Sequence, residues 1–248
     1  MSAPTSQFTV TALEPFPVVG EGDDLARTIV GVVQDRAFSL QHDDILVVAS
    51  KVVSMAERRR VDLDTVTPGR QALELSAKTG KPAEIVQLVL DESAEHYLAT
   101  ERGPIIARHH LGYTLTSAGI DRDGTDGAWL LPADPDASAR ALRDAIAAAT
   151  GTTVAVVIAD SDGRADRQGA TVISLGAAGI SPLRVTEHTE PDGRVKGQTE
   201  TFSDLVAAAA GVVLGQRGRG APVAVVRGVA YDKGDEGVRA ILHHGGDA

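Results

Sequence analysis

The feature that most constrains the fold is an unbroken run of apolar, mainly β-branched residues at 152–160, TTVAVVIAD. A run of this kind is typical of a strand that is buried on both faces. Two further apolar segments, DDILVVASKVV at 43–53 and PVAVVRG at 222–228, also predict strands. Segments with helical character lie between them, so we expect an α/β fold in which α and β elements are mixed.

Capping residues locate the clearest helix. Asp134 suits an N-cap, Pro135 a first helical position, and Gly151 a helix end. Further helices are predicted at 23–36, 68–80, 82–94 and 203–214, and further strands at 8–12, 104–108 and 113–117. Loops are predicted at 14–22, after the strand at 43–53, at 118–127, after residue 160, and at 215–221.

Composition narrows the class of protein. The 248 residues carry a formal net charge of −10, which makes nucleic acid and anionic membrane surfaces poor partners. The chain has no cysteine, which excludes disulfides, zinc–thiolate sites and cysteine nucleophiles. We see no targeting segment and no apolar run of about 18 residues. These features predict a cytoplasmic protein with one domain over 1–248 and no membrane span.

The end of the run at 152–160 carries the strongest chemical signal, Asp160-Ser161-Asp162-Gly163-Arg164. Ligands bind α/β sheets beyond the carboxyl ends of strands, and carboxylate and hydroxyl oxygens suit Mg²⁺ or Mn²⁺. The alternative is a simple Asx turn. A second acidic stretch, SAGIDRDGTDG around Asp121, is read either as a cation site or, preferably, as a solvated loop.

Two segments suit phosphate binding. Residues 214–221 (LGQRGRGA) combine glycines, which allow close backbone approach, with arginines, although the pattern is not a Walker loop. Lys51 follows a predicted strand and is a second candidate for a phosphate contact. Arg59 and Arg60 are interpreted as a solvated charged face, and the histidine pairs at 109–110 and 243–244 as non-functional.

Taken in order, these segments resemble the coenzyme F420-0:L-glutamate ligase family, also called F420 γ-glutamyl ligases. The resemblance extends from Phe16 to about Gly228. The segments that carry it are FPVVGEGDDL, DDILVVASKVVSMAE, AGID, LLPADPDASARALR, VAVVIADSDGR, LGAAGI, AAAAGVVLGQ and PVAVVRG.

The resemblance implies a two-lobed fold and an intertwined homodimer, without the C-terminal flavin domain that some members carry. It implies that GTP phosphorylates the lactyl carboxylate of F420-0, and that the amine of L-glutamate then displaces the phosphate. Two divalent ions, Mg or Mn, are expected to offset the charge on the phosphoryl group. A monovalent cation is a further candidate ligand. The implied partners are F420-0, L-glutamate and GTP.

The resemblance also assigns roles to individual residues. Asp160 and Arg164 are expected to take part in catalysis. The expected metal ligands are Asp121, Asp160, Ser161 and Gln216. The expected nucleotide-binding residues are Phe16, Pro17, Val18, Val19, Ser50, Lys51, Met55, Gly124, Leu214, Gly215, Gln216, Arg217, Gly218, Arg219, Gly220 and Ala221.

Three positions depart from the family pattern. Met55 replaces a common lysine, Gly124 stands where the family has asparagine, and Ala165-Asp166 replaces an aromatic segment before Arg167. These changes keep two alternatives open. One is a ligase that forms an amide on a different carboxylate acceptor, and the other is a non-catalytic relative that binds a nucleotide.

Overall fold

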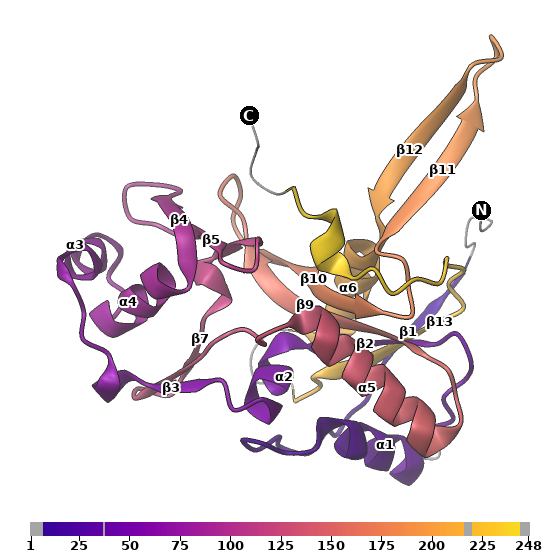
Figure 1. Ribbon diagram of the computed structural model, residues 1–248, viewed down its shortest axis with the longest axis horizontal. Coiled ribbons are helices and arrows are strands. Elements are labelled where there is room, and N and C mark those ends of the chain that lie inside the picture. The colour runs from indigo at the N-terminus through magenta and orange to yellow at the C-terminus, as the bar shows by residue number, and fades with distance from the viewer. Residues whose placement is uncertain (1–6, 37, 216–219, 244–248) are drawn as a thin grey trace.

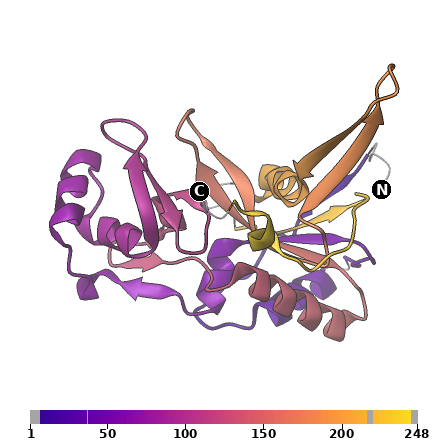
Figure 2. The ribbon, with the colours of Figure 1, turned by 45° about the horizontal axis from the view of Figure 1, so that its top comes forward.

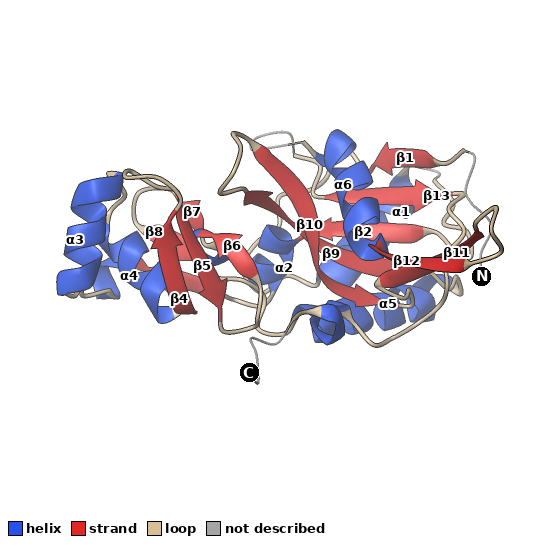
Figure 3. Ribbon diagram, turned by 90° about the horizontal axis from the view of Figure 1, so that it is seen from above, coloured by secondary structure: helices blue, strands red, loops and turns tan. Residues whose placement is uncertain are grey.

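The computed structural model describes residues 7–36, 38–215 and 220–243. A five-stranded mixed sheet has the order β1-β13-β2-β9-β10 (Figures 1 and 3). β2 and β9 are parallel, and the other neighbouring pairs are antiparallel. The strands are β1 (Thr9–Ala12), β2 (Ile45–Ala49), β9 (Ala155–Gly163), β10 (Ala170–Ala178) and β13 (Val223–Arg227).

Helices cover both faces of this sheet, as the apolar strands predicted. Alternate side chains of β9 belong to two different apolar cores. Val156 and Ile158 lie in the first core, and Val157 and Ala159 lie in the second. The first core is closed by α1 (Leu25–Asp35) and α5 (Pro135–Thr150), and the second by α6 (Phe202–Leu214). The expectation of a mixed α/β fold is confirmed.

The predicted capping residues set the helix boundaries. The Asp134 carboxylate accepts a hydrogen bond from the Ala137 N–H at 3.0 Å, and Gly151 ends α5 in the left-handed conformation with φ 72°. Asp24 caps α1 in the same way, through the N–H of Arg27 at 3.0 Å. Hydrogen bonds and backbone conformations of a few adjacent residues therefore determine where these helices begin and end.

Smaller sheets and two helices occupy the opposite end of the molecule from α1 and α5 (Figure 1). Helices α3 and α4 pack on the small sheets through apolar clusters that include Val86, Val89 and Ile105. The elements are α3 (Arg70–Thr79), α4 (Ala83–Asp91), β3 (Arg60–Asp62), β7 (Asp121–Asp123) and β8 (Gly127–Trp129) in one sheet, β4 (Ser93–Leu98), β5 (Ile105–His109) and β6 (Thr114–Thr116) in another, and the 3-10 turns η1 (Leu63–Thr65), η2 (Ser117–Gly119) and η3 (Val238–Ile241).

A two-stranded ribbon, β11 (Leu183–Thr189) with β12 (Val195–Thr201), projects from the rest of the protein (Figures 1 and 2). Most of its side chains are exposed, including Val185 and Val195. The sequence analysis predicted no strand in this segment, because its polar composition lacks the alternation of a half-buried strand.

Several predicted loops are wrong. The segment after β2 forms helix α2 (Ser50–Ala56), and part of 118–127 forms β7. β9 continues to Gly163, which excludes the Asx turn at Asp160, and β10 occupies much of the glycine-rich region. Pairing with neighbouring strands overrides the local turn preference of glycine and aspartate at these positions.

Within the described residues, no helix has the length and apolar character needed to cross a membrane.

Candidate functional site

The topology brings several predicted binding segments to one edge of the five-stranded sheet. Ala49, the last residue of β2, pairs with Ala159 of β9, and β9 continues beyond this pair to Gly163. β13 runs the other way, so its first residue, Val223, lies at the same edge. β1 ends there too, because Ala12 pairs with Ala224. We call this edge, formed by the ends of β1, β2 and β9 and the start of β13, the site edge.

The first predicted nucleotide segment, 16–19, follows β1 at the site edge. Val19 is buried and Phe16 packs against the same core, whereas Pro17 and Val18 are exposed. The N–H of Gly22, just beyond this segment, donates to the Met55 carbonyl at 2.9 Å. The loop after β1 is thereby attached to α2, the helix that follows β2.

The last predicted nucleotide segment, 214–221, leads into β13 at the same edge. Leu214 is buried at the end of α6, and Gly215 follows with φ 67°. Gly220 is exposed and Ala221 is buried. Residues 216–219, which include Gln216, Arg217, Gly218 and Arg219, lie outside the described residues, so their roles stay predictions.

Asp160 lies at the centre of the site edge, directly beyond the paired residues of β2 and β9. The first residue of α2, Ser50, is buried, and its hydroxyl donates to Asp160 Oδ1 at 2.8 Å. This contact joins two predicted site residues that are 110 positions apart in the chain. The parallel pairing of β2 with β9 accounts for this contact, because Ser50 and Asp160 directly follow the paired residues Ala49 and Ala159.

The Asp160 carboxyl group lies in an environment that opposes its negative charge. Burial raises the pKa of Asp160 to about 7, and the charge of Asp121 adds to the rise. Hydrogen bonds from the Ser50 hydroxyl and the Ser161 backbone partly offset it. The carboxylates of Asp121 and Asp160 thus repel each other, and a bound divalent cation would relieve this repulsion. The residues therefore fit a hard metal ion.

A left-handed turn directly precedes Asp121 and places it near Asp160. Ser117, Ala118 and Gly119 have φ values of 54°, 53° and 69°. Left-handed backbone in residues other than glycine costs on the order of 1–3 kcal/mol at each position and persists only where tertiary contacts impose it. The next residues form β7, which pairs with β8. The expectation of a solvated loop over 118–127 is therefore wrong for Asp121–Asp123, which form β7, and holds for the exposed turn at 124–126.

Asp162 attaches this turn to β9. Its Oδ1 accepts a hydrogen bond from the Thr116 N–H, one residue before the turn, at 2.8 Å. Burial raises the pKa of the Asp162 carboxyl, while the Thr116 backbone N–H opposes the rise. A Cβ atom on Gly163 would lie 2.7 Å from the Thr116 hydroxyl oxygen, so glycine permits this close approach. No sequence motif marked Thr116.

The charged residues after β2 are paired more than the sequence suggested. Lys51 lies 3.4 Å from the Arg122 carbonyl, next to Asp121. The Arg60 guanidinium binds Asp123 at 2.8 Å and holds the pKa of that carboxyl below its usual value. Arg59 donates to the Leu131 carbonyl at 2.9 Å. Arg59 and Arg60 thus fix β3 beside its neighbours, and the interpretation of both as a solvated face is wrong.

The positions that depart from the family pattern lie in different surroundings. Met55 packs against the core beneath α1 and therefore places no charge at the site edge. Gly124, with φ 62°, lies in the exposed turn between β7 and β8. Arg164 and the segment 165–166 are exposed just beyond β9, and Ser161 is exposed within it. Among the described residues, no three His, Cys, Asp or Glu side chains form a group that could hold a metal ion.

Comparison with known proteins decides the family. Residues 15–228 match the family described as F420-0:Gamma-glutamyl ligase. The chain belongs to this family. It is 33% identical to the coenzyme F420:L-glutamate ligase of Methanothermobacter thermautotrophicus over 241 residues, which is 95% of each chain. It is 36% identical to the enzyme of that name from Archaeoglobus fulgidus, over 89% of this chain and 87% of the relative.

A third relative of the same name, from Methanococcus maripaludis, is 38% identical over 77% of each chain. The matched region contains the segments of the site edge from the loop after β1 to the start of β13, whereas β1 itself lies before it. The resemblance seen in the sequence is therefore confirmed, and the F420-0:γ-glutamyl ligase family supplies the context for the site.

Proposed function

We propose that this protein is a GTP- and divalent-metal-dependent ligase that adds L-glutamate to coenzyme F420-0 through an acyl phosphate. The observation that carries the proposal is the convergence of Ser50, Asp121 and Asp160 at the site edge, inside a chain that belongs to this ligase family. The nucleotide segments predicted at 16–19, 50–51 and 220–221 flank the same edge.

The reaction has two steps. A lactyl carboxylate oxygen attacks the γ-phosphorus of GTP, the bond to the β-phosphate oxygen breaks, and GDP leaves. The amine of L-glutamate then attacks the acyl carbon, the bond to the phosphate oxygen breaks, and the amine loses a proton as the amide forms. Charge accumulates on the phosphoryl oxygens during the first step, and it must be offset by nearby cations.

Asp121 and Asp160 would hold a divalent ion, Mg or Mn, and Ser161 with Gln216 would serve a second. Bound there, such ions neutralise charge on the phosphates. Ser50 orients the Asp160 carboxylate through its 2.8 Å hydrogen bond. Lys51 lies close enough to Asp121 to contact a phosphate bound at the same edge. Arg164, exposed beyond β9, would bind an anionic part of the acceptor. A monovalent cation remains a further proposed ligand.

Mass spectrometry of the reaction products tests the proposal. Purified protein is incubated with F420-0, L-glutamate, GTP and manganese. We expect a product heavier by one glutamyl unit that is absent when GTP or the metal is omitted. Asp160→Asn should reduce product formation at least about a hundredfold, as removal of charge-stabilising groups does in other enzymes. Asp35→Asn, at an exposed position near the end of α1, is the matched control and should keep full activity.

Absence of product from folded wild-type protein would overturn the assignment of F420-0 as acceptor. The replacement of the family's lysine by Met55 favours a second candidate, a ligase acting on a different carboxylate acceptor. Formation of GDP with another carboxylate, together with L-glutamate or another amine, would support that candidate. Nucleotide binding without any turnover would leave the non-catalytic alternative.

We also propose the two-lobed arrangement and the intertwined homodimer that the family resemblance implies. The β11–β12 ribbon supports the dimer. A two-stranded ribbon is marginally stable without packing partners. Here Val185 and Val195 are 52% and 61% exposed on it. Packing of the ribbon against a second copy of the chain would cover these side chains.

A further inference from the structure

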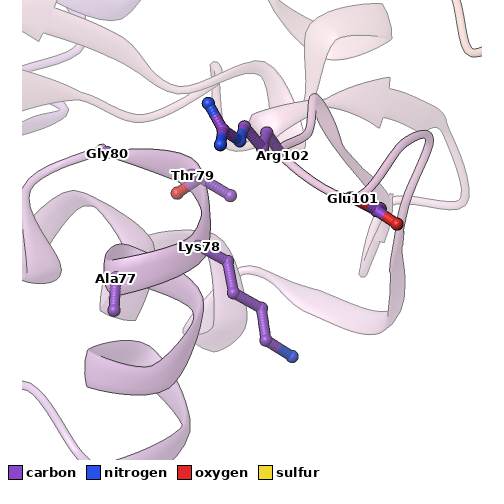
Figure 4. Close-up of a pocket in the computed structure, with 6 residues that line it drawn as sticks. All are labelled: Ala77, Lys78, Thr79, Gly80, Glu101 and Arg102. Atoms are coloured by element: carbon purple, nitrogen blue, oxygen red, sulfur yellow. The ribbon is translucent and has the colours of Figure 1, made fainter.

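Two cavities of the described structure are candidates for ligand binding. One, of about 500 Å³, lies at the end of α3 and is lined by Ala77, Lys78, Thr79, Gly80, Glu101 and Arg102 (Figure 4). Its lining contains no aromatic and no large aliphatic side chain. Lys78 and Arg102 extend in different directions (Figure 4). A ligand with an extended apolar face would therefore find little apolar surface to pack against in this cavity.

The other cavity, of about 360 Å³, lies between the β4-β5-β6 sheet and the ends of β9 and β10. One wall is a cross-strand row. Tyr97 of β4 pairs with Ile106 of β5, which in turn pairs with Thr116 of β6. Side chains directly opposite each other in a sheet share a face. Tyr97 is 54% exposed and Ile106 is 4% exposed, so Tyr97 supplies the accessible apolar surface of this wall.

The facing wall connects the cavity to the site edge. Ile173 of β10 lines the cavity and pairs directly with Asp160 of β9. Asp162 pairs with Thr171, and both also line the cavity. Directly opposed side chains have Cβ atoms about 5 Å apart. The side chain of Ile173, which lines the cavity, therefore lies next to the side chain of Asp160 at the centre of the site.

We propose that this cavity binds the planar aromatic ring system of the acceptor, with the ring beside Tyr97. The inference rests on the proposed function, in which the acceptor is a deazaflavin joined to a lactyl carboxylate by a ribityl phosphate chain. The half-buried side chain of Ile173 suits the ring face opposite Tyr97, and the hydroxyl groups of Thr114 and Thr171 suit its polar edges. Aromatic rings pack favourably on one another in offset or edge-to-face arrangements.

The distance along β9 suits the orientation that this placement requires. The ring lies on the side of Gly163, and the reacting carboxylate lies near Asp160, three strand residues or about 10 Å away. Among the described residues that line the cavity, Arg164 carries the one positive charge, and Asp162 and Asp166 carry negative charges. Arg164 is exposed just beyond β9, where its guanidinium can pair with the acceptor's phosphate. Tyr97 would thus be a specificity-determining residue for the aromatic part of the acceptor.

Equilibrium binding of F420-0, followed through its deazaflavin fluorescence with GTP and glutamate omitted, tests the proposal. Tyr97→Ala should weaken binding about tenfold, and Tyr97→Phe should stay within about threefold of wild type. Thr114→Trp, at an exposed position on the cavity wall, should obstruct the ring and weaken binding at least as much. Leu73→Ala on α3, where Leu73 is 55% exposed, is the matched control and should bind like wild type.

The outcomes separate this inference from the proposed function. Wild-type binding and turnover that are unchanged in Tyr97→Ala and Thr114→Trp would overturn the cavity assignment and leave the ligase reaction standing. Absence of F420-0 binding to folded wild-type protein would overturn both. Nucleotide binding, measured separately, should be equal in all variants, and a parallel loss of nucleotide binding would contradict a role confined to the acceptor ring.

Discussion

At the scale of single residues, the hydrogen bond between Thr116 and Asp162 holds the Asp121 turn against β9. Asp162→Ala would leave the partly buried Thr116 N–H without its acceptor, at a cost of about 1–3 kcal/mol in the free energy of unfolding. We expect turnover to fall as well, because the turn positions Asp121. Urea denaturation and initial-rate measurements check both effects.

The matched variant for this test is Asp162→Asn, which keeps an acceptor oxygen at the same place. It should retain most of the stability lost in Asp162→Ala. Equal stability of wild type and both variants would show that the hydrogen bond does not hold the turn.

A second residue-scale prediction concerns pH. The Glu92 carboxylate lies 3.2 Å from His109 Nε2, and this contact lowers the pKa of Glu92 below its ordinary value of 4.5, with Arg59 and His110 adding to the shift. A lowered carboxyl pKa stabilises the fold above the unfolded-state value, and this contribution is lost as the pH falls through the folded-state value. Glu92→Gln should therefore be less stable than wild type at pH 7.

The difference between Glu92→Gln and wild type should shrink as the pH falls below about 4.5. Denaturation midpoints between pH 7 and pH 3 measure it. Glu74→Gln, at an exposed position on α3 beside Arg70, is the control and should differ little from wild type at any pH. A constant deficit of Glu92→Gln across the range would contradict an electrostatic origin.

At the scale of elements, a buried ion pair joins the start of β2 to the end of β13. The Arg227 guanidinium binds both oxygens of Asp44 at 2.7 Å, and Asp44 is 1% exposed. Asp44→Asn should cost about 2–3 kcal/mol, less than for a fully buried pair because Arg227 keeps contact with solvent. The pair of Arg143 with Asp144, whose side chain is 68% exposed, provides the control, and Asp144→Asn should change stability by about 0.5 kcal/mol or less.

Two glycines, one at the end of a helix and one within a helix, allow predictions of opposite sign for the change in stability. Gly151 ends α5 with φ 72°, so Gly151→Ala should destabilise the protein by about 1 kcal/mol. Gly31 lies within α1, and a Cβ atom there would meet nothing within 4 Å. Gly31→Ala should therefore stabilise the protein by about 0.5–1 kcal/mol. Thermal unfolding of both variants checks the two signs, and a change of the same sign in both would contradict the conformational argument.

At the scale of the whole molecule, the proposed dimer depends on the ribbon. The double variant Val185→Thr, Val195→Thr keeps the β propensity of both strands but reduces their apolar surface. We expect wild type to be dimeric in light scattering coupled to size exclusion, and the double variant to dissociate at higher protein concentration. Val212→Thr, at an 80% exposed position on α6, is the control. Wild type that is monomeric at all concentrations would overturn the dimer.

The sequence by itself determined the elements whose ends depend on local chemistry. Asp134, Pro135 and Gly151 bound α5 as predicted, because capping and left-handed conformations are properties of a few adjacent residues. The apolar run at 152–160 identified β9, since burial on both faces requires continuous apolar character. Family membership also followed from the order of the segments.

Only the tertiary structure decided which of the candidate residues meet. Strand pairing brought Ser50 to Asp160 across 110 positions, and it placed Asp160 within β9 and not in the Asx turn that the sequence offered as an alternative. Packing against β9 imposed the left-handed turn before Asp121, which no local preference of Ser117 or Ala118 would favour. The cavity beside Tyr97 likewise exists only where two sheets face each other. Such contacts depend on long-range pairing, and a local reading of composition and spacing does not contain that information.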